Sequence, residues 1–516
     1  MFVELHILQN FAPSNLNRDD TNAPKDCEFG GFRRARISSQ CLKRSIRWHP
    51  EMRAFHPTAP LGYRSKLQAD AIRKELVRLG KPSDKADAVV QFLLRRVGFK
   101  QKGEKTSVLL FMGTDEVERI AQELVTHWDN IIRIADVDQI WEDCAARLSR
   151  LLAESDKQEI ASRADALARL VVDAKTGKKS NGKMLRSLAA FTSENWAPVI
   201  TTLEAMTDDQ FGKIDAGFVT SESEADETEE TEPEKVPDDA RKAFKKVKTV
   251  ATAIKNLTLD DVDEDAAESE DLAKQIKASI SKVLKTFCET GTTATDIALF
   301  GRMVAEVKKG AMTVTAASQV AHAISTNKVE MEFDFFTAVD DLQQTGETGA
   351  GMMGTVEFNS SCFYRYLNVD VGQLTTNLGD DPELACQTVA AFIRAAVLAV
   401  PTGKQNSMAA QNPPSFVMAV VRNNGLWSLA NAFVKPVWPK KDEDLVSASI
   451  ERLDAYWQQL ADNYGAGAVQ AKAVMTMHDE SLSNLKSDRK TGNGDQSALD
   501  AVVATVLTAL GCGGLS

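Results

Sequence analysis

The alternation of apolar and polar side chains at the start of the chain predicts a β-strand. Val3, Leu5 and Ile7 are separated by polar residues, as in a strand that buries only one of its faces. We therefore expect a half-buried strand over residues 2 to 11. Further along, the glycine pair Gly30-Gly31 predicts a turn that leads into a basic segment.

A short helix is predicted directly after this basic segment. Ser38 or Ser39 is a typical N-cap, and the chain reaches Trp48-His49-Pro50 where the helix should end. At about 100° per residue, Leu42 and Ile46 point to one side of this helix, toward a core. The opposite face carries the polar and basic side chains Gln40, Lys43, Arg44 and Arg47.

The middle of the chain has a different periodicity from its two ends. From about residue 65 to 215, and again over 272–288, apolar residues recur at helical spacing. Beyond residue 290, strand-like runs alternate with helical ones; they lie at 329–333, 363–369 and 417–421, and at 384–400 and 446–464. Strands and helices at both ends, with helices between, indicate an α+β domain that carries a long helical insertion.

The net charge of −12 is misleading because the acidic residues are concentrated in two stretches. Residues 222–239 hold ten Asp or Glu and one Lys, and residues 260–271 hold eight acids and no base. Without these stretches the chain has a net charge of about +5. Residues 219–239 contain almost no apolar side chain, so we expect a disordered acidic loop there.

The composition argues against several classes of protein. Seven scattered cysteines without a C-x-x-C pair predict reduced, mostly buried thiols, and six histidines in no ligand-like spacing argue against a metal site. The chain starts without a leader-like segment, and no apolar stretch reaches the length of a membrane span. We therefore expect a cytoplasmic protein without metal, cofactor or membrane contact.

Two segments imitate ligand-binding loops, and both fail at a required position. Residues 177–184 are similar to a phosphate-binding loop, but Met184 occupies the place of the hydroxyl residue that would hold magnesium. Residues 261–272 begin like a calcium loop, but Ala266 stands where glycine is needed and Leu272 where the closing glutamate belongs. Neither segment is predicted to bind a ligand.

The basic face of the predicted helix has two interpretations. Between Arg33 and Arg47 there are six Lys or Arg and no acid, which suits a row of contacts to a phosphate backbone. A solvated helix face gives the same pattern, and the pattern alone favours it. Similarly, Phe335 and Phe336 suit base wedging on a hairpin, although their spacing alone favours a core position. Lys404 lies in a polar loop that either holds a phosphate or is merely solvated.

Several ordered runs resemble the CasC backbone subunit of type I-E CRISPR Cascade, within the RAMP superfamily. The resemblance covers residues 1 to about 50 and about 290 to 465. It is carried by Leu16–Asp20, Lys25-Asp26, Phe29–Gly31, Arg36–Arg44, Leu299–Met303, Ala321–Thr326, Phe336–Leu342, Phe363–Tyr366 and Lys404-Gln405.

This resemblance implies an α+β fold with an RNA-recognition-like (ferredoxin-like) palm, a long helical fingers insertion and a thumb hairpin. The expected domains are a first palm part at 1–60 and fingers at 61–290, with an acidic disordered insertion at about 219–271. A second palm part follows at 291–516, and its thumb hairpin lies at about 325–362.

The resemblance also implies site residues. Contacts to the guide RNA are expected from Arg18, Lys25, Ser38, Gln40, Lys43, Arg44, Arg47, Lys404 and Gln405. A base at the thumb would be displaced by Met303, Phe336 and Thr337. Catalytic residues and metal ligands are not expected.

The function implied is a non-catalytic one. Copies of the chain would bind guide RNA (crRNA), oligomerise along it beside other Cascade subunits, and present the guide for pairing with target DNA. Two alternatives are a guide-dependent ribonuclease, which could use Asp19, Asp20 or Asp26, and a structural protein that assembles without nucleic acid.

Overall fold

The computed structural model describes residues 1–55, 60–97, 99, 101–102, 105–106, 109–132, 134–135, 205, 241–242, 272–288, 293–304, 312–338 and 352–512. The predicted acidic loop and the two ligand-like segments that begin at 177 and 261 lie outside these residues, apart from Leu272. The chain divides into two compact units. Unit 1 comprises residues 1–62, 291–303 and 313–516, and unit 2 comprises residues 63–290 and 304–312.

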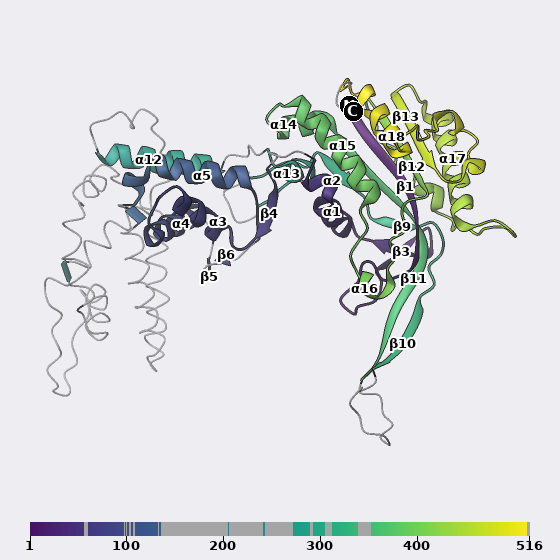
Figure 1. Ribbon diagram of the computed structural model, residues 1–516, viewed down its shortest axis with the longest axis horizontal. Helices are drawn as coiled ribbons and strands as arrows, with labels where there is room; N and C mark the ends of the chain where they lie inside the picture. The colour runs from purple at the N-terminus through teal and green to yellow at the C-terminus, as the bar shows by residue number, and fades with distance from the viewer. Residues whose placement is uncertain are drawn as a thin grey trace, which may run out of the picture. The chain divides into compact units, whose positions relative to one another are not determined.

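Unit 1 is a mixed α+β unit built on an antiparallel sheet (Figure 1), with the central order β13-β12-β1-β11-β9-β3-β2 and with β8 and β10 also paired to β11. Its strands are β1 (Phe2–Ser14), β2 (Asp26–Phe29), β3 (Phe32–Ile37), β8 (Ser318–Val320), β9 (Ala323–Ser325), β10 (Glu332–Ala338), β11 (Met352–Asp370), β12 (Phe416–Arg422) and β13 (Val469–Thr476).

The helices of unit 1 lie on both faces of this sheet. They are α1 (Ser39–Trp48), α2 (Pro50–Arg53), α13 (Thr295–Phe300), α14 (Val371–Asn377), α15 (Pro382–Leu398), α16 (Gln405–Met408), α17 (Leu445–Tyr464) and α18 (Ala498–Ala509), with 3-10 turns η3 (Ala430–Phe433), η4 (Asp479–Ser481) and η5 (Lys486–Asp488).

The central strand β1 is buried on both faces. Val3, Leu5 and Ile7 pack in a core with α1, α15 and α18, and Leu8 packs in a second core with α17. The expectation of a half-buried strand is therefore wrong, because α17 covers the face that the polar residues occupy. Glu4 and His6 are fully buried on that face.

The buried polar residues of β1 have partners from distant parts of the chain. Glu4 accepts hydrogen bonds from the Tyr366 hydroxyl (2.9 Å) and the Trp427 amide (2.6 Å), and it pairs with Arg422 at 3.4 Å. His6 Nδ1 lies 2.9 Å from the Tyr364 hydroxyl. Because burial penalises the charged form, the pKa of His6 falls to about 3.

The two long strands β10 and β11 form a hairpin that extends beyond the sheet (Figure 1). The pairing runs from Glu332 opposite Phe358 to Ala338 opposite Met352. Beyond it, β11 continues into the sheet and pairs with β1 from Ser361 to Asp370. One strand thus links the sheet rigidly to the projecting hairpin.

Two cysteines of unit 1 form a disulfide, which corrects the expectation of reduced thiols for this pair. Cys386 lies on α15, and Cys512 follows the end of α18. Gly511, with φ +80°, turns the chain at that end, and the Cys512 amide donates back to the Leu507 carbonyl. Among the other cysteines of the described residues, Cys27, Cys41 and Cys362 are free thiols.

In its described part, unit 2 combines helices with short strands. Its elements are β4 (Gly62–Ser65, which begins at the boundary), α3 (Gln68–Arg78), α4 (Ser83–Val97), β5 (Gln101–Lys102), β6 (Lys105–Thr106), β7 (Leu110–Gly113), α5 (Thr114–Thr126) and α12 (Leu272–Cys288). The helix predicted at 272–288 is confirmed as α12. Its apolar residues Ile276, Ile280 and Phe287 share one core with α3, α4 and α5.

Candidate nucleic-acid interface

The loop between β1 and β2 folds into a tight turn that presents Arg18. Asp19 Oδ1 accepts three hydrogen bonds, from the Thr21 amide (2.8 Å), the Thr21 hydroxyl (2.7 Å) and the Ala23 amide (3.0 Å). These bonds lower the pKa of the Asp19 carboxyl. The Lys25 amide closes the turn by donating to the Asn17 carbonyl at 2.8 Å. Arg18 is exposed beside this turn.

The start of α1 is fixed against the same loop. Of the two predicted caps, Ser38 is the N-cap, and its hydroxyl accepts from the Cys41 amide at 3.4 Å. The Ser38 amide in turn donates to Asn17 Oδ1 at 2.8 Å. Because the Ser38 side chain is buried and engaged in the cap, it shapes the start of the helix.

A third segment, more than 380 residues away in sequence, packs against this loop. A Cβ on Gly403 would lie 2.3 Å from the Leu16 carbonyl oxygen, so only glycine permits this close approach. Lys404 follows with a left-handed backbone, φ 51°, and begins α16. The side-chain amide of Gln405 donates to the Pro401 and Ala410 carbonyls, at 3.0 and 3.2 Å. Lys404 is therefore held beside the Arg18 loop.

Basic side chains from three segments gather near α1. Arg36 Nη1 lies 3.0 Å from His322 Nδ1. Burial, then the charges of Arg36 and Lys25, lowers the pKa of His322. Both Arg44 and Lys25 act electrostatically on the Cys41 thiol, whose pKa burial raises. Lys25, Arg36 and Arg44 thus form a positive surface together with Lys404 and Arg18, which we call the cationic track.

The exposed face of α1 is rotated from the face that the sequence predicts. The most exposed side chains are Gln40, Arg44 and Trp48, which are spaced four residues apart. Lys43 is half-buried, and its Nζ lies 5.7 Å from the centre of the Phe300 ring. The prediction that Arg47 lies on the exposed face is wrong, because its side chain is only 8% exposed.

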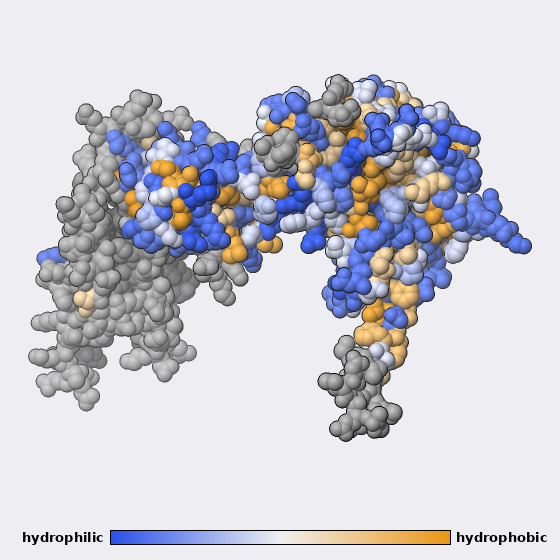
Figure 2. All heavy atoms as spheres, viewed as in Figure 1, coloured by the Kyte–Doolittle hydropathy of each residue, from blue (hydrophilic) through white to orange (hydrophobic). Residues whose placement is uncertain are grey.

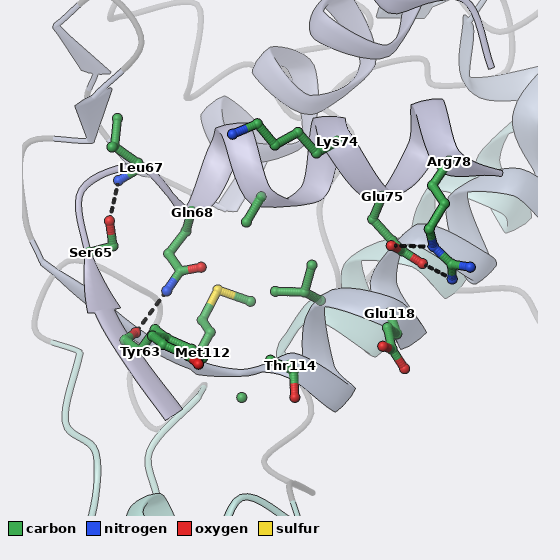
Figure 3. Close-up of a pocket in the computed structure, with 13 residues that line it drawn as sticks. Tyr63, Ser65, Leu67, Gln68, Lys74, Glu75, Arg78, Met112, Thr114 and Glu118 are labelled. Atoms are coloured by element: carbon green, nitrogen blue, oxygen red, sulfur yellow. Dashed lines mark hydrogen bonds and ion pairs between the residues drawn. The ribbon is translucent and has the colours of Figure 1, made fainter. Parts of the chain in front are cut away.

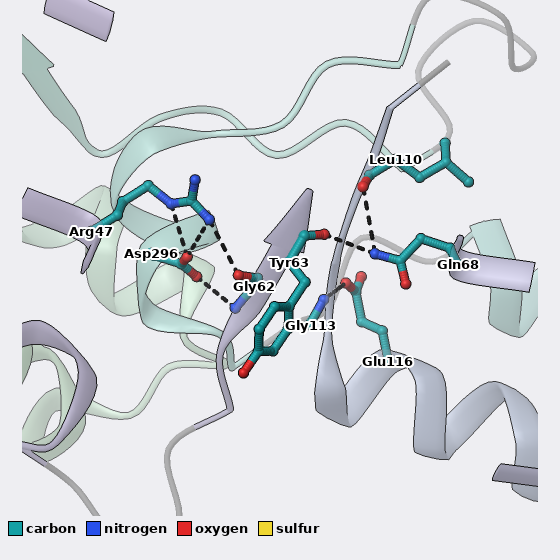
Figure 4. A network of polar contacts seen from close by, with 8 residues as sticks. All are labelled: Arg47, Gly62, Tyr63, Gln68, Leu110, Gly113, Glu116 and Asp296. Carbon is teal, nitrogen blue, oxygen red and sulfur yellow. Dashed lines mark hydrogen bonds and ion pairs between the residues drawn. The ribbon is translucent and has the colours of Figure 1, made fainter. Parts of the chain in front are cut away.

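Arg47 is buried because a carboxylate meets it from α13. Asp296 accepts from Arg47 Nε at 3.0 Å and lies 2.9 Å from its Nη2, and it also accepts from the Gly62 amide at 2.9 Å (Figure 4). Arg47 Nη2 donates to the Gly62 carbonyl at 3.2 Å. Burial raises the pKa of Asp296, and Arg47 opposes this rise only in part. Arg47 therefore joins α1, α13 and Gly62 within unit 1.

The β10–β11 hairpin exposes several large apolar side chains. Phe333 and Phe335 are 66% and 64% exposed, so the core position that their spacing favours is wrong for Phe335. Phe336 is 36% exposed and lies on the opposite face of the strand, where its ring covers Gly354. Thr337 follows it and is exposed. Figure 2 shows apolar atoms gathered along this hairpin.

Met303 does not belong to this hairpin. It follows α13 and is 85% exposed, in a segment separate from β10. The expectation that Met303 displaces a base at the thumb together with Phe336 and Thr337 stays a prediction. The segment after α13 is distinct because Gly301, with φ +74°, ends the helix and turns the chain toward Val314.

Unit 2 contains a pocket of about 490 Å³ between α3 and α5 (Figure 3). Its apolar lining includes Tyr63, Leu67 and Met112. The charges at its rim are paired, since Lys74 contacts Asp70 at 2.8 Å and Arg78 contacts Glu75. The side-chain amide of Gln68 donates to the Tyr63 carbonyl at 2.8 Å, which fixes the wall of the pocket. This arrangement offers shape and apolar surface but no group poised for chemistry.

Within the ranges that the structure describes, no group of three or more His, Cys, Asp or Glu is placed to hold a metal ion. No helix in the described part of the chain has the length and apolar character of a membrane span.

The sequence interpretation missed Arg36, His322 and Trp48. Arg36 and His322 occur in runs that the resemblance quotes, but their 3.0 Å contact joins residues 286 positions apart. The exposure of Trp48 could have been predicted from the sequence, because it lies four residues after Arg44 and eight after Gln40, on the same side of the helix. The predicted end of the helix at this residue obscured that spacing.

Two solved structures share the fold of this chain. A chain titled "CRISPR RNA-guided surveillance complex, pre-nicking" has a TM-score of 0.57 and 24% identity, and the match covers 98% of this chain and 99% of that one. A chain titled "CRISPR RNA-guided surveillance complex" has a TM-score of 0.50 and 20% identity, with the same coverage. No curated protein sequence matches the chain.

One protein-family model matches most of the sequence. It is described as "CT1975-like protein", and its matches cover residues 3–178 and 144–505. These two matches together span both units and the elements that carry the cationic track. The chain belongs to the CT1975-like protein family.

Proposed function

We propose that this chain is the guide-RNA-binding backbone subunit of a type I-E Cascade complex. The observation that carries the proposal is the cationic track, in which the Arg18 loop, α1 and the Lys404 loop meet although they are far apart in sequence. Exposed or half-buried Lys and Arg from several fixed segments suit a phosphate backbone, because each neutralised phosphate releases a counterion. The titles of the two structural neighbours agree with this role.

In this proposal the units take the roles that the resemblance implies. Unit 1 is the RNA-recognition-like palm, unit 2 is the fingers, and the β10–β11 hairpin is the thumb. Phe336 and Thr337 displace a base of the guide, while Arg18, Lys25, Gln40, Lys43, Arg44 and Lys404 contact its backbone. Gln405 and Ser38 support the track by fixing its loops. The partners are crRNA, further copies of the chain, other Cascade subunits and target DNA by way of the guide, in the cytoplasm.

We assign no catalytic role to the aspartates near the track. Asp19 is engaged by three hydrogen bonds of its own turn, and Asp26 pairs with Arg33. A carboxylate that must bind a metal needs free oxygen lone pairs directed at the ion. Two of the three aspartates that the ribonuclease alternative could use are thus engaged within the fold, whereas Asp20 is exposed, so the choice between binding and cleavage rests on the experiment below.

The experiment that tests the proposal is co-expression of the full chain with a CRISPR array. The purified protein should carry RNA of guide length, seen as a high ratio of absorbance at 260 to that at 280 nm. Complementary RNA added with Mg²⁺ should remain intact. Protein that is free of RNA would refute the proposal in favour of a structural assembly, and regularly spaced cuts would refute it in favour of the ribonuclease.

A further inference from the structure

Trp48 extends the exposed stripe of α1 by one turn beyond Arg44. The indole is 51% exposed, although tryptophan is a residue that proteins bury to a large extent. Gln40, Arg44 and Trp48 are spaced by four residues, so they lie along one side of the helix. A strand whose phosphates follow Gln40 and Arg44 therefore reaches the indole at the end of the helix.

The indole is held in position before any ligand binds. The Arg53 guanidinium from α2 lies over the Trp48 ring, 4.4 Å from its centre. The chain between them is fixed, because the His49 side chain accepts from the Glu51 amide and Pro50 begins α2. A cation that stacks on one face of an indole limits the rotation of the ring. The Trp48 ring nevertheless remains 51% exposed. Binding to a pre-organised ring loses less entropy than binding to a mobile one.

The charges around Trp48 suit an anionic partner, and the exposed ring beside them favours single-stranded nucleic acid. Helix α1 carries no acid, its exposed Arg44 lies one turn before Trp48, and Arg53 adds a further cation at the ring; Arg47 is already neutralised by Asp296. The acid nearest in sequence is Glu51, whose backbone amide donates to the His49 side chain that caps α2. An exposed aromatic ring beside cations is the combination that single-stranded nucleic acid recognises, since bases stack on the ring while phosphates meet the cations.

We propose that Trp48 is a stacking platform for one base of single-stranded RNA, at the end of the cationic track. This inference rests on the proposed guide-binding function and adds a base contact to it. The contact is independent of base identity, because every base has a π face. It lies on unit 1 and is separate from the β10–β11 hairpin.

The test compares full-length variants in binding a fluorescent oligouridylate of roughly 12 nucleotides, within the range of sites that such proteins use. Trp48→Ala should weaken binding roughly tenfold, while Trp48→Phe, which keeps an aromatic ring, should stay within about threefold of the wild type. Trp438→Ala is the matched control, because Trp438 is 64% exposed on another segment of unit 1. That control should bind like the wild type.

Indole fluorescence supplies a second measurement. Saturating RNA should quench the emission of the wild type more than that of Trp48→Phe, because stacking on Trp48 removes its emission. Equal quenching in the two proteins, or equal affinity of Trp48→Ala and wild type, would overturn the platform.

The outcomes separate this inference from the function on which it rests. Suppose that the wild type binds the oligonucleotide, that Arg44→Ala weakens this binding, and that Trp48→Ala leaves it unchanged. Only the platform then fails. If the wild type does not bind RNA, the proposed function fails and the platform with it. If Trp48→Ala disrupts self-association of RNA-free protein in sedimentation but leaves RNA affinity unchanged, Trp48 belongs to a protein interface and the platform is refuted.

Discussion

Arg47 and Arg44 lie on the same helix, three residues apart, and the structure gives them opposite roles. Arg47 is buried against Asp296, whereas Arg44 is exposed on the cationic track. A buried guanidinium is costly unless it is paired, so Arg47 is committed to the fold. An exposed guanidinium retains its donors for a ligand. The comparison shows that a basic helix face consists of one stripe that holds the protein together and another that is exposed to solvent.

The largest effect on stability is expected from removing the buried Arg47. Arg47→Ala leaves Asp296 buried without its cation, which typically costs about 3 to 5 kcal/mol of the free energy of unfolding. Arg44→Ala, the matched control, should change stability by less than about 0.5 kcal/mol because its side chain is exposed. Urea denaturation of both variants measures the difference. Equal stability of the two proteins would show that the Arg47 pair does not support the fold.

The next largest effect concerns His6, a buried base that makes the stability of the protein depend on pH. Its pKa is about 3 in the folded protein and about 6.5 in an unfolded chain. Between these values the unfolded chain binds a proton that the folded protein does not. Stability contributed by neutral His6 is therefore complete above pH 6.5 and falls by about 1.4 kcal/mol per pH unit below it.

The measurement for His6 is denaturation at pH 7 and at pH 5. The wild type should lose about 2 kcal/mol more than His6→Gln between these two values. Glu4, whose pKa burial raises, is present in both proteins, so its own contribution cancels in the difference. A parallel loss in the two proteins would contradict the assigned burial of a neutral imidazole.

The smallest effect on stability is expected on the projecting hairpin. Phe335→Ala and Phe336→Ala should each alter the melting of RNA-free protein only slightly, with Phe336→Ala the larger because its ring covers Gly354. Phe392→Ala, at a core position on α15, should cost about 3 to 5 kcal/mol. Thermal melting compares the three. A loss for Phe335→Ala as large as that for Phe392→Ala would place the hairpin against a surface of its own chain.

Local signals in the sequence predicted the elements well. The Ser38 cap, the helix over 272–288 and the strand-like run at 417–421 are confirmed by α1, α12 and β12. Each depends on neighbouring residues, whose spacing or capping chemistry is readable in one dimension. The α+β class follows from these elements.

Long-range pairing explains where the sequence interpretation failed. The partner of Arg47 is 249 residues away, and the helix α17 that buries Glu4 and His6 lies more than 430 residues after them. A helical wheel shows that Arg47 shares a face with Lys43, but not that a carboxylate from another segment covers one edge of that face. Because the exposed stripe of α1 runs through Gln40 and Arg44, it also includes Trp48.

The most direct test of RNA binding by the cationic track is its dependence on salt. Affinity for a single-stranded guide should fall linearly with salt on logarithmic axes, and each lost phosphate contact should reduce the slope by about 0.7. Arg18→Ala with Arg44→Ala should therefore reduce the slope by about 1.4. The double variant Lys440→Ala with Lys441→Ala removes two exposed lysines of another segment and should leave the slope unchanged. Slopes that are the same for wild type, track variant and control would contradict the account.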